Sequence, residues 1–277
     1  MNWCKLVAYD LRKGLLRWRY LGSMFIFFVP CMELWMNIRY LDNPGSFMDY
    51  MLYLFKGTEP IAKYDGILTQ VRMPIVWILS VTGCLFLNLD YLPKELSFSG
   101  QNVFVRSNSR KWWYLSKCVW NLCSCALYFF LAVLTAAIAV LMTGANFSLE
   151  NTPEVSKVVF GAVILEPLNL NSLIGILISF VLPYITVAAL SLLEMLLCLR
   201  FKPVMSFIIC ICILVLSVYW DSPFAIGNGA MVIRSEYIAN NGLPTMPSLL
   251  FPLLVIFVCI AGGITWFKYV DILDLEE

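Results

Sequence analysis

The sequence predicts an all-α polytopic membrane protein with six transmembrane helices, an N-terminal interfacial elbow helix and both termini in the cytoplasm. Of its 277 residues, 61% are apolar and only 13% are charged, whereas soluble domains average about 45–50% apolar and about 25% charged. A soluble globule cannot bury this much apolar surface, so the composition is typical of helices that cross a bilayer. Residues 1–277 are predicted to form a single transmembrane domain.

The charge balance and the absence of histidine exclude several functions. The chain has 19 basic and 18 acidic residues, a net charge of +1, and no histidine. This balance excludes a nucleic-acid binder that works by overall charge. Without histidine, the chain supplies neither a Ser-His-Asp triad nor a histidine-ligated metal site. All ten cysteines except Cys4 fall in or near apolar runs, so we expect small apolar fillers rather than disulfides or metal ligands.

Six apolar runs are long enough to cross a membrane, which takes about 20 mostly apolar residues. Glu33 interrupts the first run and Arg72 lies near the start of the second, whereas the other four carry no charge. Pro74 and Pro183 are expected flex points in the second and fourth runs. The predicted spans are residues 21–38, 67–89, 118–142, 173–193, 203–220 and 249–267.

Lysine and arginine are unevenly distributed between the two sides of these spans. Thirteen of the 19 precede the first span, follow the second or fourth span, or lie in the C-terminal tail. By the positive-inside rule this side is cytoplasmic, which places both termini there. Residues 221–248 then form an outer loop that is unusually apolar, and either a plain loop or a segment that dips back into the outer leaflet fits this composition.

Residues 1–19 are predicted to form a basic amphipathic helix at the cytoplasmic membrane surface. A plain membrane anchor and an interfacial helix that also contacts a partner both fit this pattern. The apolar side chains recur at helical spacing and comprise Trp3, Val7, Leu11, Leu15 and Trp18. The basic side chains lie on another face and comprise Lys5, Arg12, Lys13, Arg17 and Arg19.

The connection between the second and third spans, residues 90–117, is the only sizeable inner loop. It mixes apolar side chains with charges of both signs, which favours docking to a cytoplasmic protein over simple chain reversal. The predicted docking residues are Lys94, Glu95, Leu96, Phe98, Gly100, Val103 and Arg106.

This order of elements, from an interfacial helix through a long inner loop to six spans, resembles the exporter-type ABC transporter permeases of the type V fold. The likeness covers essentially the whole chain by topology and length. Its closest local match is Glu95, Gly100, Ser109-Arg110 and Lys117, which is similar to the family's coupling helix and its return to the membrane. The resemblance implies that Leu92 to Val105 carries the coupling helix and that residues 1–19 are the elbow helix.

The resemblance also implies a function. The chain would be the permease subunit of an ATP-driven exporter in a bacterial cell membrane, moving an amphiphilic substrate such as a peptide, an antibiotic or a lipid-like molecule. It would pair with a second copy or a related permease. The sequence has no Gly-x-x-x-x-Gly-Lys-Ser/Thr motif, so we expect no cofactor on this chain and ATP with Mg²⁺ on separate ABC ATPase subunits.

A substrate cavity would draw on polar side chains inside the spans, although each of these more often serves helix packing. A carboxylate inside a span is a functional candidate in its own right. The predicted cavity residues are Glu33, Asn121, Thr135, Ser179, Tyr184, Thr186 and Ser206. Two other interpretations remain open: a polytopic membrane enzyme acting on lipid or peptide, and a scaffold subunit that transports nothing. No catalytic or metal-binding residue is predicted.

Overall fold

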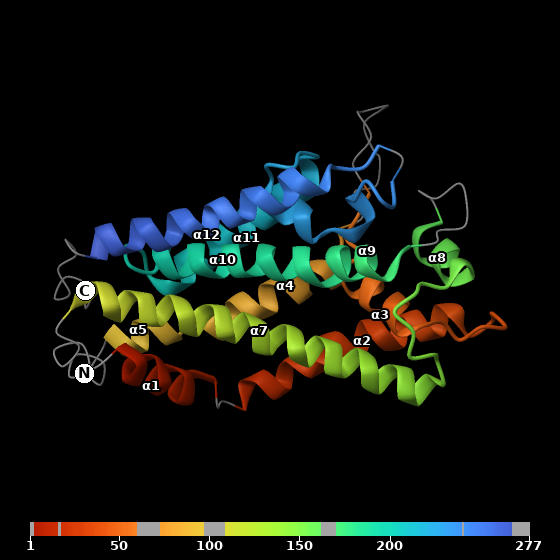
Figure 1. Ribbon diagram of the computed structural model, residues 1–277, viewed down its shortest axis with the longest axis horizontal. Coiled ribbons are helices and arrows are strands. Elements are labelled where there is room, and N and C mark those ends of the chain that lie inside the picture. Colours follow the sequence, from red (N-terminus) through yellow and green to blue (C-terminus); the bar gives the residue numbers. More distant parts are fainter. Residues whose placement is uncertain are drawn as a thin grey trace.

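A computed structural model describes residues 3–15, 18–59, 73–96, 109–161, 170–239 and 241–267 of the chain (Figure 1). The regular elements of these segments are all helical. The long ones are α2 (Arg19–Ile38), α4 (Ile75–Asn88) continued by α5 (Tyr91–Leu96), α7 (Arg110–Thr143), α9 (Ser172–Ile176) continued by the π-helical turn η1 (Leu177–Val181) and α10 (Leu182–Leu197), α11 (Pro203–Tyr219) and α12 (Thr245–Phe267). The short ones are α1 (Trp3–Leu15), α3 (Phe47–Leu54), α8 (Pro153–Phe160) and the 3₁₀ turns η2 (Ile226–Ala230) and η3 (Val232–Arg234).

Within the described segments, five helical stretches are long and apolar enough to cross a membrane. They are α2, α4 with α5, α7, α9 through α10, and α12. The predicted fifth span corresponds to α11, which is apolar but only 17 residues long. The chain is therefore a multi-pass helical membrane protein. A total of six spans and the cytoplasmic location of the termini stay predictions.

The structure moves the start of the third predicted span. We expected residues 118–142, but α7 begins at Arg110 and runs for 34 residues. At 1.5 Å per residue such a helix is about 50 Å long, which exceeds the roughly 30 Å of hydrocarbon in a bilayer. The segment from Arg110 to Trp113, expected at the membrane re-entry, is the first turn of this helix. The helix therefore extends beyond the membrane at its N-terminal end if its apolar part lies in the bilayer.

The two predicted flex prolines take different positions. Pro74 directly precedes α4, so it starts that helix rather than bending it. Pro183 lies in the first turn of α10, just after the π-helical turn η1. A wide turn before a proline relieves the clash between its ring and the preceding carbonyls, so the irregularity at η1 has a local cause.

Two segments between the long helices fold back into the bundle. The first is α3, whose start is fixed by a capping box in which Ser46 and Asp49 bond each other's backbone N–H groups. Most of its side chains, including Met48, Tyr50 and Leu52, are buried. Burial raises the pKa of Asp49, and hydrogen bonds from Thr152 and Ser46 act against that rise. The first loop is thus a packed part of the core.

The second such segment contains η2 and η3, and it is held by Arg234. This side chain is 1% exposed. Its guanidinium donates to the carbonyl oxygens of Ser217 and Val218 at 2.9 and 2.7 Å and to that of Thr58 at 3.0 Å. The first two carbonyls belong to the last turn of α11, where the helix dipole is negative. This segment is therefore packed against the helices, and its position relative to the outer leaflet stays a prediction.

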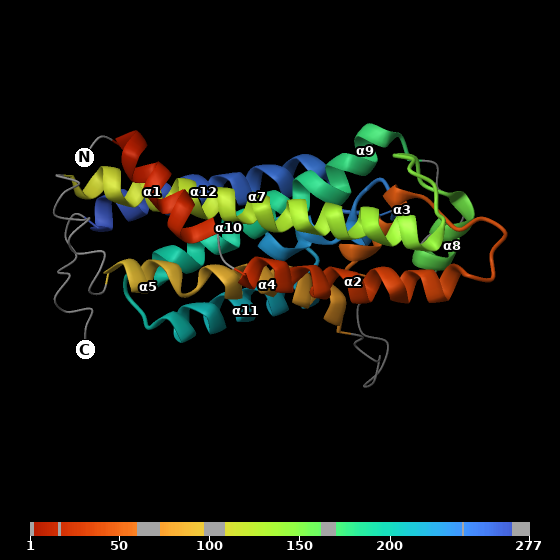
Figure 2. The ribbon, with the colours of Figure 1, turned by 90° about the horizontal axis from the view of Figure 1, so that it is seen from below.

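The bundle has two distinct ends (Figures 1 and 2). One end carries α1, α5, the start of α7 and the end of α12, and the other carries α3, α8 and α9. The beginning and the end of the described chain thus lie at the same end of the molecule. The site described next is built at that end.

Candidate functional site

A cluster of buried ionic side chains joins three helices at the end of the bundle that carries α1. Asp10 of α1, Glu95 of α5 and Lys117 of α7 are each at most 1% exposed. The ammonium of Lys117 lies 2.6 Å from Asp10 Oδ1 and 3.1 Å from Glu95 Oε2. A single lysine therefore bridges two carboxylates that come from different helices.

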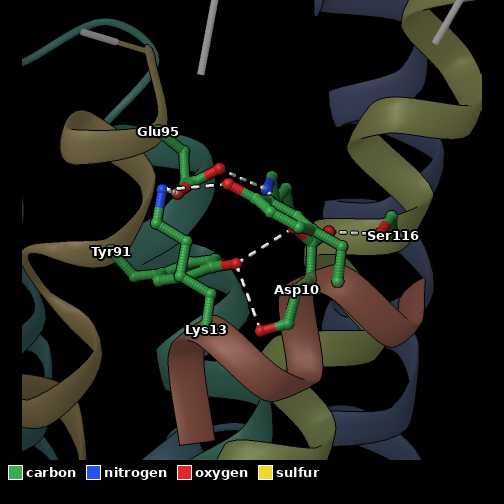
Figure 3. Close-up of polar contacts among 7 residues, drawn as sticks. Asp10, Lys13, Tyr91, Glu95 and Ser116 are labelled. Carbon is green, nitrogen blue, oxygen red and sulfur yellow. Dashed lines mark hydrogen bonds and ion pairs between the residues drawn. The ribbon is translucent and has the colours of Figure 1, made fainter. Parts of the chain in front are cut away.

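Further polar groups complete this ion cluster (Figure 3). Lys13 of α1 lies 2.6 Å from Glu95 Oε1, so two lysines face two carboxylates and the charges balance. The Tyr91 hydroxyl donates to Asp10 Oδ1 at 3.1 Å, and the Ser116 hydroxyl donates to Asp10 Oδ2. Buried charges are tolerated when they are paired and their remaining hydrogen-bonding positions are filled. The cluster meets both conditions.

Aromatic rings cover the Lys117 ammonium. It lies 5.0 Å from the ring centres of both Tyr91 and Trp113. The Tyr91 ring also stacks on Trp120, with 3.6 Å between the ring centres. Cation–π contacts of this kind strengthen when water is excluded. The rings therefore stabilise the lysine and also fix the distance between α5 and α7.

The face that α1 buries differs from the predicted one. Its buried side is Leu6, Asp10 and Gly14, which follow one another at helical spacing. Gly14 permits the close approach to α7, because a Cβ at this position would lie 1.9 Å from the indole Nε1 of Trp120. The predicted apolar stripe is left partly or largely uncovered: Trp3 is 39% exposed. That stripe remains free to face lipid, as an interfacial helix requires.

The other predicted residues of the N-terminal helix lie outside the ion cluster, with the exception of Lys13. Lys5 and Arg12 are exposed, and Arg17 lies outside the described residues. Burial lowers the pKa of Lys13, but its hydrogen bonds to Glu95 and Tyr9 outweigh that effect and raise the pKa above its ordinary value of 10.5. Lys13 is therefore held in its charged form by the cluster.

The predicted docking residues fall into two groups. Lys94 is exposed and pairs with Asp90 at 2.9 Å, and Asp90 also lies 3.0 Å from Arg19 of α2. Glu95 was expected on a docking surface, but its carboxylate is buried and occupied by two lysines. The side chain of Leu96 and all of Phe98, Gly100, Val103 and Arg106 lie outside the described residues, so contact of this segment with an ATPase stays a prediction.

Most of the predicted cavity residues with a hydroxyl group donate a hydrogen bond to a backbone carbonyl, three of them within their own helical segment. The hydroxyls of Thr135, Ser179 and Ser206 donate to the carbonyl four residues earlier in the chain, a common way to satisfy a hydroxyl in a helix. The Tyr184 hydroxyl donates to the carbonyl of Leu122 on α7. The Thr186 hydroxyl is buried and has no hydrogen-bond partner among the described residues. A role of these hydroxyls in a substrate cavity stays a prediction.

Glu33 and Asn121 have opposite environments. Glu33 is exposed on α2, and its place in a substrate cavity stays a prediction. It lies beside Tyr53 of α3, where burial and the Glu33 carboxylate raise the pKa of the tyrosine hydroxyl. Arg72, the charge near the start of the second predicted span, lies outside the described residues. Asn121 is buried and lines a small cavity between α4, α7 and α10.

The sequence did not single out Asp10, Tyr91 or Ser116 as site residues. Asp10 had one available signal, since it is the only acidic residue among the basic side chains of the first 19 positions. Its partner Lys117 was named in the sequence analysis only as part of the family resemblance. All ten cysteines are free, and seven of them are buried. Among the described residues, no group of three or more Cys, Asp or Glu side chains is arranged to hold a metal ion.

Comparison with known proteins assigns a family. A family model described as "protein of unknown function (DUF2705)" matches residues 24–273. The chain belongs to this family. The DUF2705 match includes Glu95 and Lys117 of the ion cluster and begins after Asp10 and Lys13. No curated protein and no solved structure matches the chain.

Proposed function

We propose that this DUF2705 protein is the membrane-spanning permease subunit of an ATP-driven exporter whose ATPase is a separate polypeptide. The chain forms a multi-pass helical bundle and its sequence has no P-loop motif, which supports the placement of ATP hydrolysis on another polypeptide. The proposal further includes a second permease copy or a related permease, with ATP and Mg²⁺ bound by the partner ATPases.

The ion cluster is the observation that carries the proposal. It connects α5, which overlaps the predicted docking segment from Leu92 to Val105, to α1 and α7 through buried ion pairs. A push on the docking segment would therefore reach α7 directly, because a packed and paired cluster moves as a unit rather than deforming continuously. The 34-residue α7 runs from this end of the bundle to the other and would carry the displacement along its length.

In this mechanism the residues of the chain act mechanically. Closure of two ATPase subunits on ATP pushes the docking segments of two permeases, and the helices tilt to move an amphiphilic substrate outward. The cluster keeps α1 attached to α5 and α7 during this movement. Trp3 of α1 and Trp18, which follows that helix, are exposed and would hold α1 at the membrane surface.

Co-purification tests the proposal. The tagged chain is isolated from its native membrane in mild detergent, and bound proteins are identified by mass spectrometry and assayed for ATP hydrolysis. We expect an ABC ATPase to be retained by the wild type and lost from Phe98→Asp. Phe147→Asp is the matched control, because Phe147 is 62% exposed and lies after α7, at the other end of the bundle.

Two results would count against the proposal in different ways. If no ATPase accompanies the wild-type chain, the exporter function is refuted. If the ATPase remains bound to Phe98→Asp, the docking segment has been assigned to the wrong residues. Loss of the ATPase from both variants would indicate general unfolding, which size-exclusion chromatography of each variant detects.

A further inference from the structure

A further buried carboxylate, Glu194, lies between helices and has no partner among the described residues. It belongs to the last turn of α10 and is only 2% exposed. Neither carboxylate oxygen has a hydrogen-bond partner in the described part of the chain. Arg200, the next basic residue along the chain, is exposed.

Glu194 lines a small polar cavity between α4, α7 and α10. The other polar side chains of its wall are Asn88, Asn121 and Ser191, and the rest of the wall is mainly apolar. The cavity measures about 10 Å³, which is the space that one water molecule needs. A buried water also needs two to four polar partners, and this wall offers them.

The wall is fixed by its own hydrogen bonds. Asn88 donates from Nδ2 to Ser191 Oγ at 2.9 Å, and Asn121 donates from Nδ2 to the Ser191 carbonyl at 3.3 Å. Asn88 also accepts from the Ser124 hydroxyl. These contacts tie α4 and α7 to α10 around the carboxyl of Glu194. Hydrogen bonds between three helices thus hold the wall of the cavity in place.

Among the described residues, no charged group pairs with Glu194 from the elements packed around it, and Lys94 and Glu95 of the neighbouring α5 pair with other residues. The titratable groups that interact with it are thiols: Cys84 of α4, Cys125 of α7, Cys198 just after α10 and Cys210 of α11. Cys259 of α12 faces Cys210, and η1 and η2 contain no titratable residue. None of the five salt bridges among the described residues includes Glu194.

The burial of Glu194 and its lack of a partner among the described residues together decide which protonation state of its carboxyl is favoured. An ionised carboxylate in such a place has lost its water and gained no cation or donor in return, so this form is strongly disfavoured. A neutral carboxylic acid needs much less: its O–H donates to one acceptor and its carbonyl accepts one hydrogen bond. A single water in the cavity supplies both partners and passes its remaining hydrogen bonds to the polar wall.

We propose that Glu194 is a proton-binding site, in which the neutral carboxylic acid holds one proton and hydrogen-bonds one water between α4, α7 and α10. The proton comes from the aqueous phase at the α1 end of the bundle, toward which α10 runs. Release of the proton leaves a carboxylate that must be hydrated, so it requires this three-helix interface to open. The site therefore links proton occupancy to helix packing, and it does so whether or not the chain is a permease.

Infrared spectroscopy of the purified full-length protein tests this proposal. At pH 7 we expect a carbonyl-stretch band of a protonated carboxylic acid that shifts in D₂O. Ordinary glutamates, with a pKa of about 4.3, are ionised at this pH and contribute no such band. We expect Glu194→Gln to remove the band. Glu150→Gln is the matched control, since Glu150 is exposed, and it should leave the band unchanged.

A second variant at position 194 and a change of cation provide two further tests. If Glu194→Gln fails to fold, Glu194→Asp keeps a carboxyl in a different position and should move the band to another frequency. The proposal is overturned if the wild type has no protonated-carboxyl band, or if the band is identical in the Glu194 variants. It is also overturned if replacing Na⁺ by K⁺ at constant ionic strength creates or removes the band, because the bound cation would then be sodium.

Discussion

Replacement of Lys117 by methionine should destabilise the protein strongly. Methionine keeps the length of the side chain, so the loss of packing is small and costs less than about 1.5 kcal/mol. The loss of charge dominates. Of its partners among the described residues, Asp10 then keeps the hydroxyls of Tyr91 and Ser116, and Glu95 keeps Lys13. Removing one partner of a buried ion pair typically costs about 3–5 kcal/mol, because the remaining charge is left uncompensated.

The assay is reversible denaturant unfolding in detergent, followed by tryptophan fluorescence from the nine tryptophans. We expect Lys117→Met to lower the free energy of unfolding by about 3–5 kcal/mol. The double variant Asp10→Asn/Lys117→Met removes both charges and should recover about 2 kcal/mol or more of that loss, since contacting residues couple by roughly 0.5–3 kcal/mol. A single variant that costs less than about 1 kcal/mol, or a double variant no better than the single, would refute the assignment of Lys117 as the bridging charge.

Two further predictions concern α1. Gly14→Ala should lower the free energy of unfolding by about 1–3 kcal/mol, because the new methyl meets the Trp120 indole. Gly22→Ala is the matched control, because no atom lies within 4 Å of the Cβ that it adds. In the same unfolding assay this control should be neutral or stabilising by up to about 1 kcal/mol. An equal effect of the two substitutions would contradict close packing at Gly14. The contribution of Lys13 should depend on pH: its pKa is raised in the folded protein, so the stability difference between wild type and Lys13→Met should be fully present below pH 10.5 and shrink as the pH rises through the folded pKa. If the stability difference between wild type and Lys13→Met grew with pH, the pKa of Lys13 would be lowered in the folded protein rather than raised, and the prediction would be refuted.

The sequence predicted the class of fold well because hydrophobicity is a local property. Runs of apolar residues without charges can only be helices that avoid water, and each of the six runs corresponds to a described helix, with the part of the second run at 67–72 outside the described residues. The start of α4 at Ile75 was not predicted, since the second run was expected to begin at residue 67 with Pro74 as a flex point inside it. The length of α7 was less accessible, since its first two turns are polar and aromatic and resemble a loop in composition.

The candidate site was predicted only in part. The sequence predicted Lys13 on the basic face of the N-terminal helix and Glu95 on the docking loop. Lys117 was named only as part of the resemblance to the permease family. Nothing in the sequence indicated that Asp10 meets Lys117, which lies 107 positions away along the chain. Pairing at this range is decided by how the helices pack, and packing of α1 depends on the contact between Gly14 and Trp120.

The amino-acid sequence by itself determined that this chain is a helical membrane protein with a basic, amphipathic N-terminus, because those properties depend on composition and spacing within single segments. Only the tertiary structure decided which charges are buried. Glu33 and Glu194 both interrupt or border apolar runs, yet one is exposed beside α3 and the other is enclosed by α4, α7 and α10. The difference arises because burial is a property of neighbouring helices, which a single segment does not contain.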